Sequence, residues 1–136
     1  MDGRRPTSSP GQLAGRLGED LADAHLRRLG WQVVQRNWRC PSGEIDIIAR
    51  EPLGGGRQAL VFVEVKYRSG TGYGDPLEAI TRAKVTKLVD LAHLWIRENR
   101  AGGGLPGMHG IRIDAVGVLR QPDGSHRISH VRGITR

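Results

Sequence analysis

One apolar segment of this chain carries charged side chains at a spacing that could support chemistry. In the run 61–66, Glu64 and Lys66 are two residues apart, so on a strand both would lie on the same face. Burying a carboxylate and an ammonium on a strand apolar enough to be central costs free energy unless the charges are compensated. The pair therefore indicates either a functional site or, as the alternative, a cross-face ion pair on a half-exposed strand.

A second carboxylate, Asp46, can meet Glu64 if their strands form an antiparallel hairpin through the glycines at 54–56. Two converging carboxylates repel each other, and a divalent cation with oxygen ligands, Mg²⁺ or Mn²⁺, relieves that repulsion. Lys66 could then orient or help to deprotonate a water molecule, or stabilise charge on a phosphate. This set predicts metal-assisted cleavage of phosphodiesters. The apolar residues that alternate with Asp46 are expected to share the opposite face of the strand: Ile45, Ile47 and Ala49.

Three other charged residues near this set have more than one interpretation. Glu44 shares a face with Asp46, and it is either a further metal ligand or a residue that fixes the turn after Gly43. Lys84 interrupts the apolar side of a second helix, and it either extends its ammonium into solvent without a function or reaches a phosphate. Asp114 lies within an alternating strand pattern, where we expect a structural or substrate-side role and no metal contact.

Around these residues the chain resembles the PD-(D/E)xK nuclease superfamily, in which an acidic residue on one strand and an (Asp/Glu)-x-Lys on the next bind the metal. More closely, it is similar to the YraN-like family of small uncharacterised bacterial proteins, which themselves resemble Holliday-junction resolvases. The first half of the superfamily motif lacks its proline in this chain. The resemblance extends over about residues 13–119 and is carried by Gly15-x-x-Gly18-Glu19-x-x-Ala22, Arg36-Asn37, Gly43-Glu44-Ile45-Asp46, Val61-Phe62-Val63-Glu64-Val65-Lys66-x-Arg68, Lys84 and Arg112-Ile113-Asp114.

The resemblance implies an α/β fold with a restriction-endonuclease-like core, in which helices flank a mixed sheet. It implies that Asp46 and Glu64 bind a Mg²⁺ or Mn²⁺ ion together with the main-chain carbonyl of Val65. Lys66 would be the catalytic lysine, and Glu19 on the first helix would complete both the catalytic and the metal-binding set. The resemblance also allows a homodimer.

The elements that must position these residues follow from the periodicity of the apolar residues. A first helix is predicted over Leu13–Leu29, where apolar residues recur at helical spacing. A second helix is expected to begin at Asp75, with Pro76 in the first helical position and Glu78 completing a capping box. Strands are predicted at 31–38, 44–50, 59–68 and 111–119, with an optional fifth at 125–131. The resulting order is α-β-β-β-α-β.

The length of 136 residues fits one domain that can bury a core without disulfides. Residues 1–12 are polar and basic, and we predict a disordered tail there. Residues 13–136 are predicted to form a single nuclease-like domain, since neither repeats nor a linker interrupt them.

The charge balance favours a polyanionic partner. Lys and Arg number 21 against 14 Asp and Glu, which gives a formal net charge of +7. Such a surplus promotes contacts with phosphates, and the predicted partner is nucleic acid, specifically DNA. The alternative is that the basic composition is a property of the lineage. The residues predicted to contact nucleic acid are Arg36, Arg39, Arg68, Arg82, Lys84 and Lys87.

Several other classes of protein are disfavoured by the sequence. Cys40 is the only cysteine, which excludes an internal disulfide and disfavours a cysteine-based zinc site. The first twelve residues lack the apolar core of a secretory signal, and no apolar run approaches the ~18 residues that span a bilayer. We therefore expect a cytoplasmic protein that does not partner with membranes.

Three functions are compatible with these features. The first is a metal-dependent DNA endonuclease, selective for branched or damaged structures by analogy with resolvases. The second is a nucleic-acid-binding module without independent cleavage activity. The third is a basic RNA-associated structural protein, which would not need the carboxylates at positions 46 and 64. Those carboxylates, with Lys66, favour the endonuclease.

Overall fold

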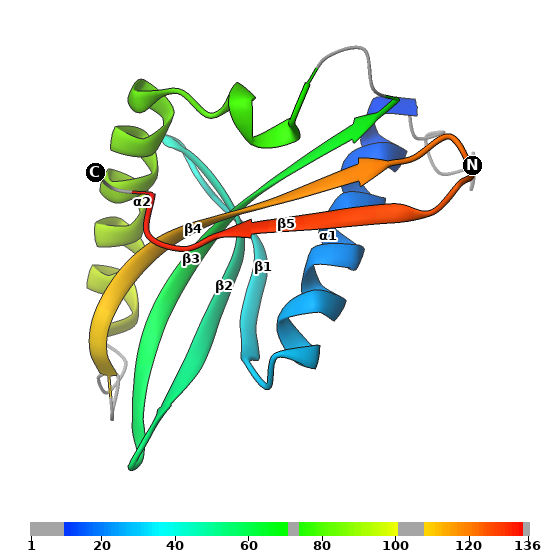
Figure 1. Cartoon of the computed structure of the whole chain (residues 1–136). Coiled ribbons are helices and arrows are strands. Elements are labelled where there is room, and N and C mark those ends of the chain that lie inside the picture. The colour runs from blue at the N-terminus through cyan, green and yellow to red at the C-terminus, as the bar shows by residue number, and fades with distance from the viewer. Residues whose placement is uncertain (1–9, 71–73, 101–107, 135–136) are drawn as a thin grey trace, which may run out of the picture.

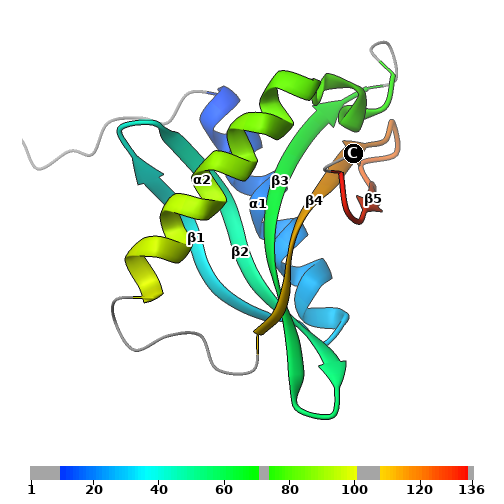
Figure 2. The same ribbon diagram turned by 90° about the vertical axis from the view of Figure 1, so that its left-hand side faces the viewer.

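The computed structural model describes residues 10–70, 74–100 and 108–134, and within these ranges five strands form one sheet with an α-helix on each face (Figures 1 and 2). The helix α1 lies on one side of the sheet and α2 on the other, where it crosses the strands diagonally in Figure 2. The elements in chain order are α1 (Pro10–Arg28), β1 (Gln32–Cys40), β2 (Gly43–Gly54), β3 (Arg57–Ser69), the 3₁₀ turn η1 (Pro76–Ala79), α2 (Arg82–Arg100), β4 (Met108–Arg120) and β5 (His126–Val131).

The sheet is mixed and has the strand order β1-β2-β3-β4-β5. The strands β3 and β4 are parallel, because α2 carries the chain back across the sheet between them, whereas the other neighbours are antiparallel. The predicted fold, with the order α-β-β-β-α-β and a mixed sheet flanked by helices, is thereby confirmed, and β5 is the optional last strand.

Each face of the sheet buries its own hydrophobic cluster. On the α1 side, helix residues Ala22 and Leu26 pack on the central strands. On the α2 side, Trp95 packs edge-to-face on Phe62, with 5.7 Å between the ring centroids. The Trp95 indole Nε1 donates a hydrogen bond of 2.9 Å to Gln35 on β1. A sheet covered on both faces explains why the central strand β3 reads as a nearly continuous apolar run.

Two boundaries differ from the predicted ones. The helix α1 begins at Pro10, three residues before the predicted start, so the predicted disordered tail is wrong for residues 10–12, and residues 1–9 lie outside the described ranges. The β2–β3 hairpin is longer than predicted, because Pro52 and Gly54 still pair with β3 and only Gly55–Gly56 form the turn.

The second helix does not begin at Asp75. The Asp75 carboxylate accepts a hydrogen bond of 2.8 Å from the Leu77 amide, but it caps only η1. That turn packs on the sheet at Gly117, where an added Cβ would lie 3.1 Å from the Leu77 side chain. The helix α2 has its own cap, since the Thr81 hydroxyl accepts a hydrogen bond of 3.1 Å from the Lys84 amide. Two N-capping residues, Asp75 and Thr81, thus follow each other closely in the sequence, and only Thr81 caps the long helix α2.

Among the residues that the structure describes, no helix is long and apolar enough to cross a membrane.

Candidate active site

The site forms where the side chains of two paired strands, β1 and β2, stop alternating regularly between the two faces of the sheet. Ile45 packs in the α2-side cluster, whereas Ile47 packs in the α1-side cluster. The neighbouring strand changes in the same way, because Arg36 reaches acidic residues of α1 while Trp38 packs on the α2 side. Between them, Asn37 has a φ of 53°, a left-handed conformation that interrupts the alternation of side chains. The expectation that Ile45 and Ile47 share a face is therefore wrong.

Asp46 lies at this irregular position, where β2 separates from β3. The pairing of the two strands ends at Ile47 and Val63, and β3 continues beside β4 alone. The Asp46 Oδ2 accepts a hydrogen bond of 2.8 Å from the Val65 amide, so the side chain occupies the place of a strand partner. This bond fixes the carboxylate next to Glu64, the residue between Val63 and Val65.

Glu64 and Asp46 interact directly. The Glu64 residue is 6% exposed. Burial, the charge of Glu64 and a side-chain hydrogen bond with Glu64 raise the pKa of Asp46 to about 7, although the hydrogen bond from the Val65 amide opposes this. The structure thus brings together the two carboxylates that the sequence analysis placed on neighbouring strands.

A third carboxylate approaches the pair from α1. Burial and the negative charge of Asp46 raise the pKa of Glu19, while Asn37 and Arg36 lower it through hydrogen bonds and, for Arg36, also through its charge. The neighbouring Gly18 explains the close approach of the helix, since an added Cβ would lie 3.0 Å from the Tyr67 Cβ on β3. The helix, β2 and β3 therefore each contribute one acidic side chain to the same region.

Two lysines belong to the region from the α2 side of the sheet. The Lys84 Nζ lies 3.5 Å from Glu64 Oε2, so one ammonium on α2 faces the most buried carboxylate of the set. Lys66 is half-buried, follows Glu64 by two residues and pairs in register with Gly117 of β4. Lys84 was expected either to extend into solvent or to reach a phosphate, and its contact with Glu64 is one that periodicity alone could not indicate.

The donor set agrees in part with a divalent cation. Two carboxylates that repel each other in a buried position are the arrangement that a hard cation with oxygen ligands stabilises. Across the described ranges, however, no group of three or more His, Cys, Asp or Glu side chains is arranged to hold a metal ion. Asp46 and Glu64 are therefore the pair in place, and Glu19 would have to move toward them to complete a set of three.

The basic residues predicted to contact nucleic acid divide into different environments. Arg36 forms ion pairs with α1, and Arg39 lies 3.2 Å from Glu44, the exposed acid whose charge also contributes to raising the pKa of Asp46. Arg68 is half-buried and Arg82 is exposed. The Lys87 side chain passes close to Gly43, at the turn between β1 and β2.

A polar hollow adjoins the carboxylates between α1 and the β1–β2 hairpin. Its volume is ≈ 400 Å³, which is large enough for a piece of substrate to enter. Arg16 and Glu19 line it from α1, and Arg39 lines it from β1. The residues that line it are Gln12, Gly15, Arg16, Glu19, Asn37, Arg39 and Glu44.

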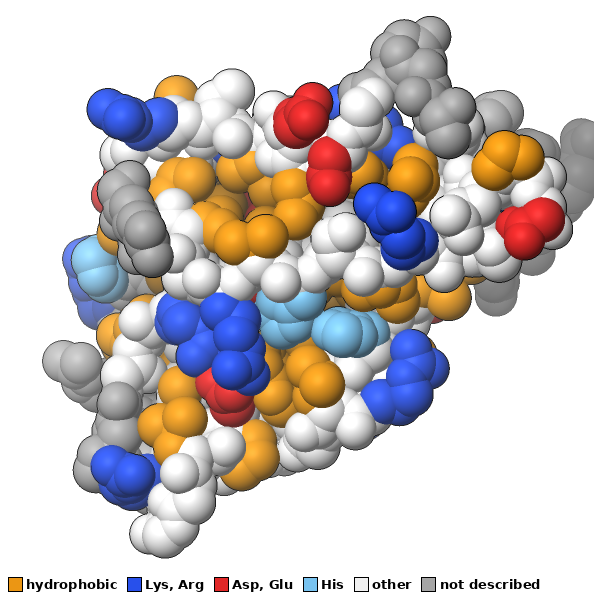
Figure 3. All heavy atoms as spheres, viewed as in Figure 1, with side chains coloured by type: hydrophobic (Ala, Val, Ile, Leu, Met, Phe, Trp, Pro, Cys, Tyr) orange, Lys and Arg blue, Asp and Glu red, His pale blue; other side chains and the backbone are white. Residues whose placement is uncertain are grey.

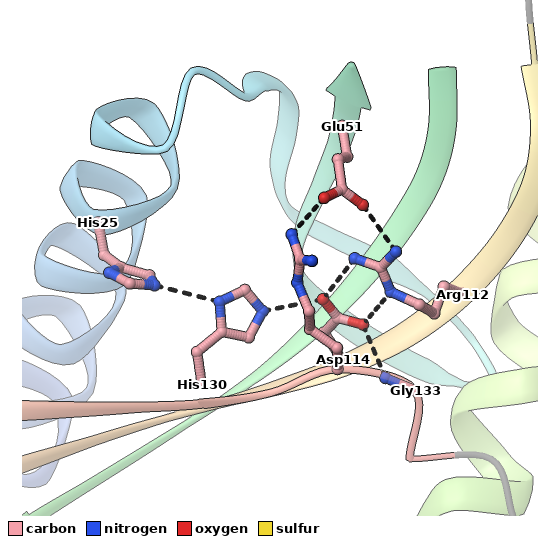
Figure 4. A network of polar contacts seen from close by, with 7 residues as sticks. His25, Glu51, Arg112, Asp114, His130 and Gly133 are labelled. Carbon is pink, nitrogen blue, oxygen red and sulfur yellow. Dashed lines mark hydrogen bonds and ion pairs between the residues drawn. The ribbon is translucent and has the colours of Figure 1, made fainter. Parts of the chain in front are cut away.

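A second polar cluster, which sequence reasoning missed, surrounds Asp114 (Figure 4). The Asp114 side chain is fully buried and accepts hydrogen bonds from Arg112 (2.7 and 3.0 Å), from the Gly133 amide (3.1 Å) and from His130 Nε2 (2.8 Å). His130 in turn contacts His25 on α1 at 3.1 Å. Figure 3 shows histidine, basic and acidic side chains gathered between apolar areas on the face seen in that view.

This cluster ties the chain's last strand to its first helix. Glu51 of β2 joins it through ion pairs with Arg112 (2.7 Å) and Arg132, and both guanidinium groups lie over the Trp31 ring. The predicted structural role of Asp114 agrees with this burial. The sequence signals for the cluster were Asp114 in an apolar strand and Arg112 two residues before it, because its other partners come from distant segments.

The fold and the site together define the class of protein: a mixed α/β domain with a helix on each face of its sheet, with two acidic strand residues and one acidic helix residue at the point where β2 separates from β3. The model of "Uncharacterised protein family UPF0102" matches residues 18–118. The chain belongs to this family, and the resemblance to the YraN-like proteins is confirmed.

Curated relatives support the assignment over nearly the full length. A UPF0102 protein of Acidothermus cellulolyticus is 41% identical over 132 residues, which cover 93% of this chain and 96% of that protein. A UPF0102 protein of Beutenbergia cavernae is 44% identical and covers 88% and 93% of the two chains. A UPF0102 protein of Streptomyces griseus is 46% identical and covers 89% and 94%.

Among solved structures, the chain is similar to SfsA of Pyrococcus furiosus in complex with Ca²⁺, with a TM-score of 0.38 and 18% identity. The match covers 90% of this chain and spans 64% of the SfsA chain.

Proposed function

We propose that this protein is a metal-dependent endonuclease that cleaves phosphodiester bonds in DNA with Mg²⁺ or Mn²⁺. The observation that carries the proposal is the meeting of the half-buried Asp46 with the buried Glu64, with Glu19 approaching from α1. Burying adjacent carboxylates destabilises a fold, and cation binding is the function that compensates for it. The formal net charge of +7 supports a polyanionic substrate.

In this proposal each residue has a distinct task. Asp46 and Glu64 would hold the cation with the carbonyl of Val65, and Glu19 would complete the set. When bound, the cation supplies Lewis acidity for hydrolysis of a phosphodiester by water. Lys66 would orient the attacking water or stabilise negative charge on the phosphate through its ammonium group.

Lys84 would have a supporting electrostatic task in the same reaction. Its ammonium offsets part of the negative charge of Glu64 at 3.5 Å, which lowers the repulsion that an approaching phosphate experiences. The side chain is 38% exposed, so its ammonium is also accessible to the DNA backbone. Cleavage of both strands of a duplex would require two such sites, and we expect a homodimer acting in the cytoplasm.

Cleavage assays test the proposal. Plasmid, linear and four-way-junction DNA are incubated with the protein and Mg²⁺, Mn²⁺ or EDTA. Glu64→Gln and Lys66→Ala are each expected to lower the cleavage rate by about 100-fold or more, because Glu64 would hold the cation and Lys66 would act on the water or the phosphate. Glu98→Gln, an exposed carboxylate far along α2, is the matched control and should cleave like the wild type.

The same assays separate the alternative function. Cleavage that persists in EDTA or in both variants would contradict the metal-dependent mechanism. Binding of DNA without cleavage in any condition would instead support a nucleic-acid-binding module, and what favours that alternative is that no three carboxylate, histidine or cysteine side chains of the described residues are arranged to hold a metal ion.

A further inference from the structure

Arg36 forms the centre of an ion-pair cluster between β1 and α1. Its Nη2 lies 2.7 Å from Asp20 Oδ1 and 3.6 Å from Glu19 Oε1, and its Nη1 lies 3.4 Å from Asp23 Oδ2. The side chain is 29% exposed, so one guanidinium occupies a largely covered position against three acidic residues of a single helix. Such an engagement differs from the phosphate contact that the sequence predicted for this arginine.

The cluster acts at the point where α1 contributes to the site. Arg36 immediately precedes Asn37, the residue with the left-handed backbone, and both side chains interact with Glu19. Two consecutive residues of β1 thus hold the carboxyl group that faces Asp46 from the helix. The rotation of α1 about its own axis, which decides where Glu19 points, is fixed by the shorter contacts to Asp20 and Asp23.

The lengths of these contacts leave Glu19 free to be redirected. Its distance to the guanidinium, 3.6 Å, is the longest of the three, so this contact is weaker than the 2.7 Å bond between the guanidinium and Asp20. Arg36 can therefore keep α1 in place while Glu19 turns toward a cation. In addition, the Arg36 Nε is buried without a hydrogen-bond partner among the described residues, a cost that a contact optimised for stability alone would avoid.

We propose that Arg36 is a positioning residue, which clamps α1 on β1 so that Glu19 is presented to the Asp46–Glu64 pair. The inference rests on the proposed function, since presenting Glu19 matters only if the pair binds a cation. Arg36 does not touch the reacting atoms; it acts through Glu19 alone.

Calorimetric titration with Mn²⁺ tests this relation. Arg36→Gln is expected to weaken Mn²⁺ binding about tenfold, as loss of an outer residue that orients a ligand typically does. In a Glu19→Gln background the same change should have no further effect, because the residue it positions is already gone. Arg27→Gln, which removes another ion pair of the same helix with Asp23, should bind Mn²⁺ like the wild type.

Two outcomes of the titration would overturn the proposal. The first is an equal loss from Arg36→Gln with and without Glu19, which would show that the arginine acts by another route. The second is an equal loss in Arg27→Gln, which would show a general effect on α1. Circular dichroism of each variant establishes that it is folded.

A measurement without metal keeps the proposal separate from the proposed function. The side-chain amide resonances of Asn37 report on its hydrogen bond with Glu19. They should shift in Arg36→Gln, shift less in Arg36→Lys, and stay unchanged in Arg27→Gln. If the wild type binds no Mn²⁺, the proposed function fails. The positioning of Glu19 by Arg36 is then supported if these shifts occur, and it is contradicted if Arg36→Gln leaves the resonances unchanged.

Discussion

At the scale of single residues, the site depends on Asp46, a side chain whose ionised form is unfavourable in the folded protein. Asp46 is held by one backbone hydrogen bond from Val65, but it is half-buried beside the buried Glu64. Its folded-state pKa of about 7 lies above the ordinary value of 3.8. The folded protein therefore retains a proton that the unfolded chain releases, and stability decreases as the pH rises through this window.

Asp46→Asn is accordingly expected to stabilise the metal-free protein at pH 8. Asparagine retains an oxygen that can accept the hydrogen bond from the Val65 amide, but it removes the repulsion with Glu64. We expect a gain of about 1–3 kcal/mol in the free energy of unfolding by urea at pH 8, and a much smaller gain near pH 4, where the wild-type side chain is protonated.

Asp90→Asn, an exposed position on α2, is the control and should change neither value. Added Mg²⁺ should raise the melting temperature of the wild type more than that of Asp46→Asn. A less stable Asp46→Asn protein at pH 8 would contradict this account of the pair.

At the scale of secondary-structure elements, the close packing of α1 on β3 decides where Glu19 lies. Two glycines of this helix, Gly15 and Gly18, lie in different environments. At Gly18 an added Cβ would lie 3.0 Å from the Tyr67 Cβ, an atom that side-chain rotation cannot move away. At Gly15, which borders the polar hollow, an added Cβ would meet no atom within 4 Å.

These two glycines give a matched pair of substitutions. Gly15→Ala should stabilise the protein by up to about 1 kcal/mol, because alanine favours the helix and nothing obstructs its methyl group. Gly18→Ala gains the same helix propensity but forces α1 away from β3, and we expect a net loss of about 1–2 kcal/mol. Urea unfolding measures both, and equal effects of the two substitutions would show that the helix is not held at this contact.

At the scale of the whole molecule, the cluster around Asp114 joins α1, β2, β4 and β5. Burial is the largest single influence on Asp114 and would raise its pKa, but hydrogen bonds from His130, Arg112 and the Gly133 amide together hold the pKa below its usual value. The pKa of His25, the residue of α1 in this cluster, is lowered by burial and by the neighbouring His130 and Arg28. The lowered pKa of Asp114 favours its charged form, and the lowered pKa of His25 favours its neutral form, in the folded state.

Asp114→Asn is therefore expected to destabilise the protein by about 3 kcal/mol or more at neutral pH, because it removes the fully buried one of the two carboxylates that pair with Arg112. A carboxylate with a depressed pKa contributes stability above pH 3.8 and loses that contribution as the pH falls through its folded-state pKa. The difference between variant and wild type should thus shrink in acid. Chemical unfolding from pH 7 to pH 3 measures it.

Asp123→Asn is the control for this substitution. Asp123 lies in the exposed turn before β5, where an asparagine can still accept the 2.9 Å hydrogen bond from the Ser125 amide. Little change is expected at any pH. Equal sensitivity of the two variants would show that the buried cluster does not stabilise the molecule.

The order of the elements and the pair of carboxylates that meet in the fold could be predicted from the amino-acid sequence. Apolar periodicity indicated both helices and the strands, because a sheet and two helices that bury one core must repeat apolar residues at periods of 2 and 3.6. The motif around Asp46 and Glu64-Val65-Lys66 identified the carboxylates that the fold brings together. Local spacing could do this, since these residues lie on two strands joined by one hairpin.

Several features of the site could be seen only in the folded structure, because they depend on contacts between distant segments of the chain. The change of faces at Asn37, the contact of Lys84 with Glu64 and the engagement of Arg36 by α1 each join elements that no sequence period relates. The true start of α2 likewise depends on η1 packing against β4, because the sequence offers a cap at Asp75 and another at Thr81. Side-chain direction at such positions is fixed by packing, and packing exists only in the folded chain.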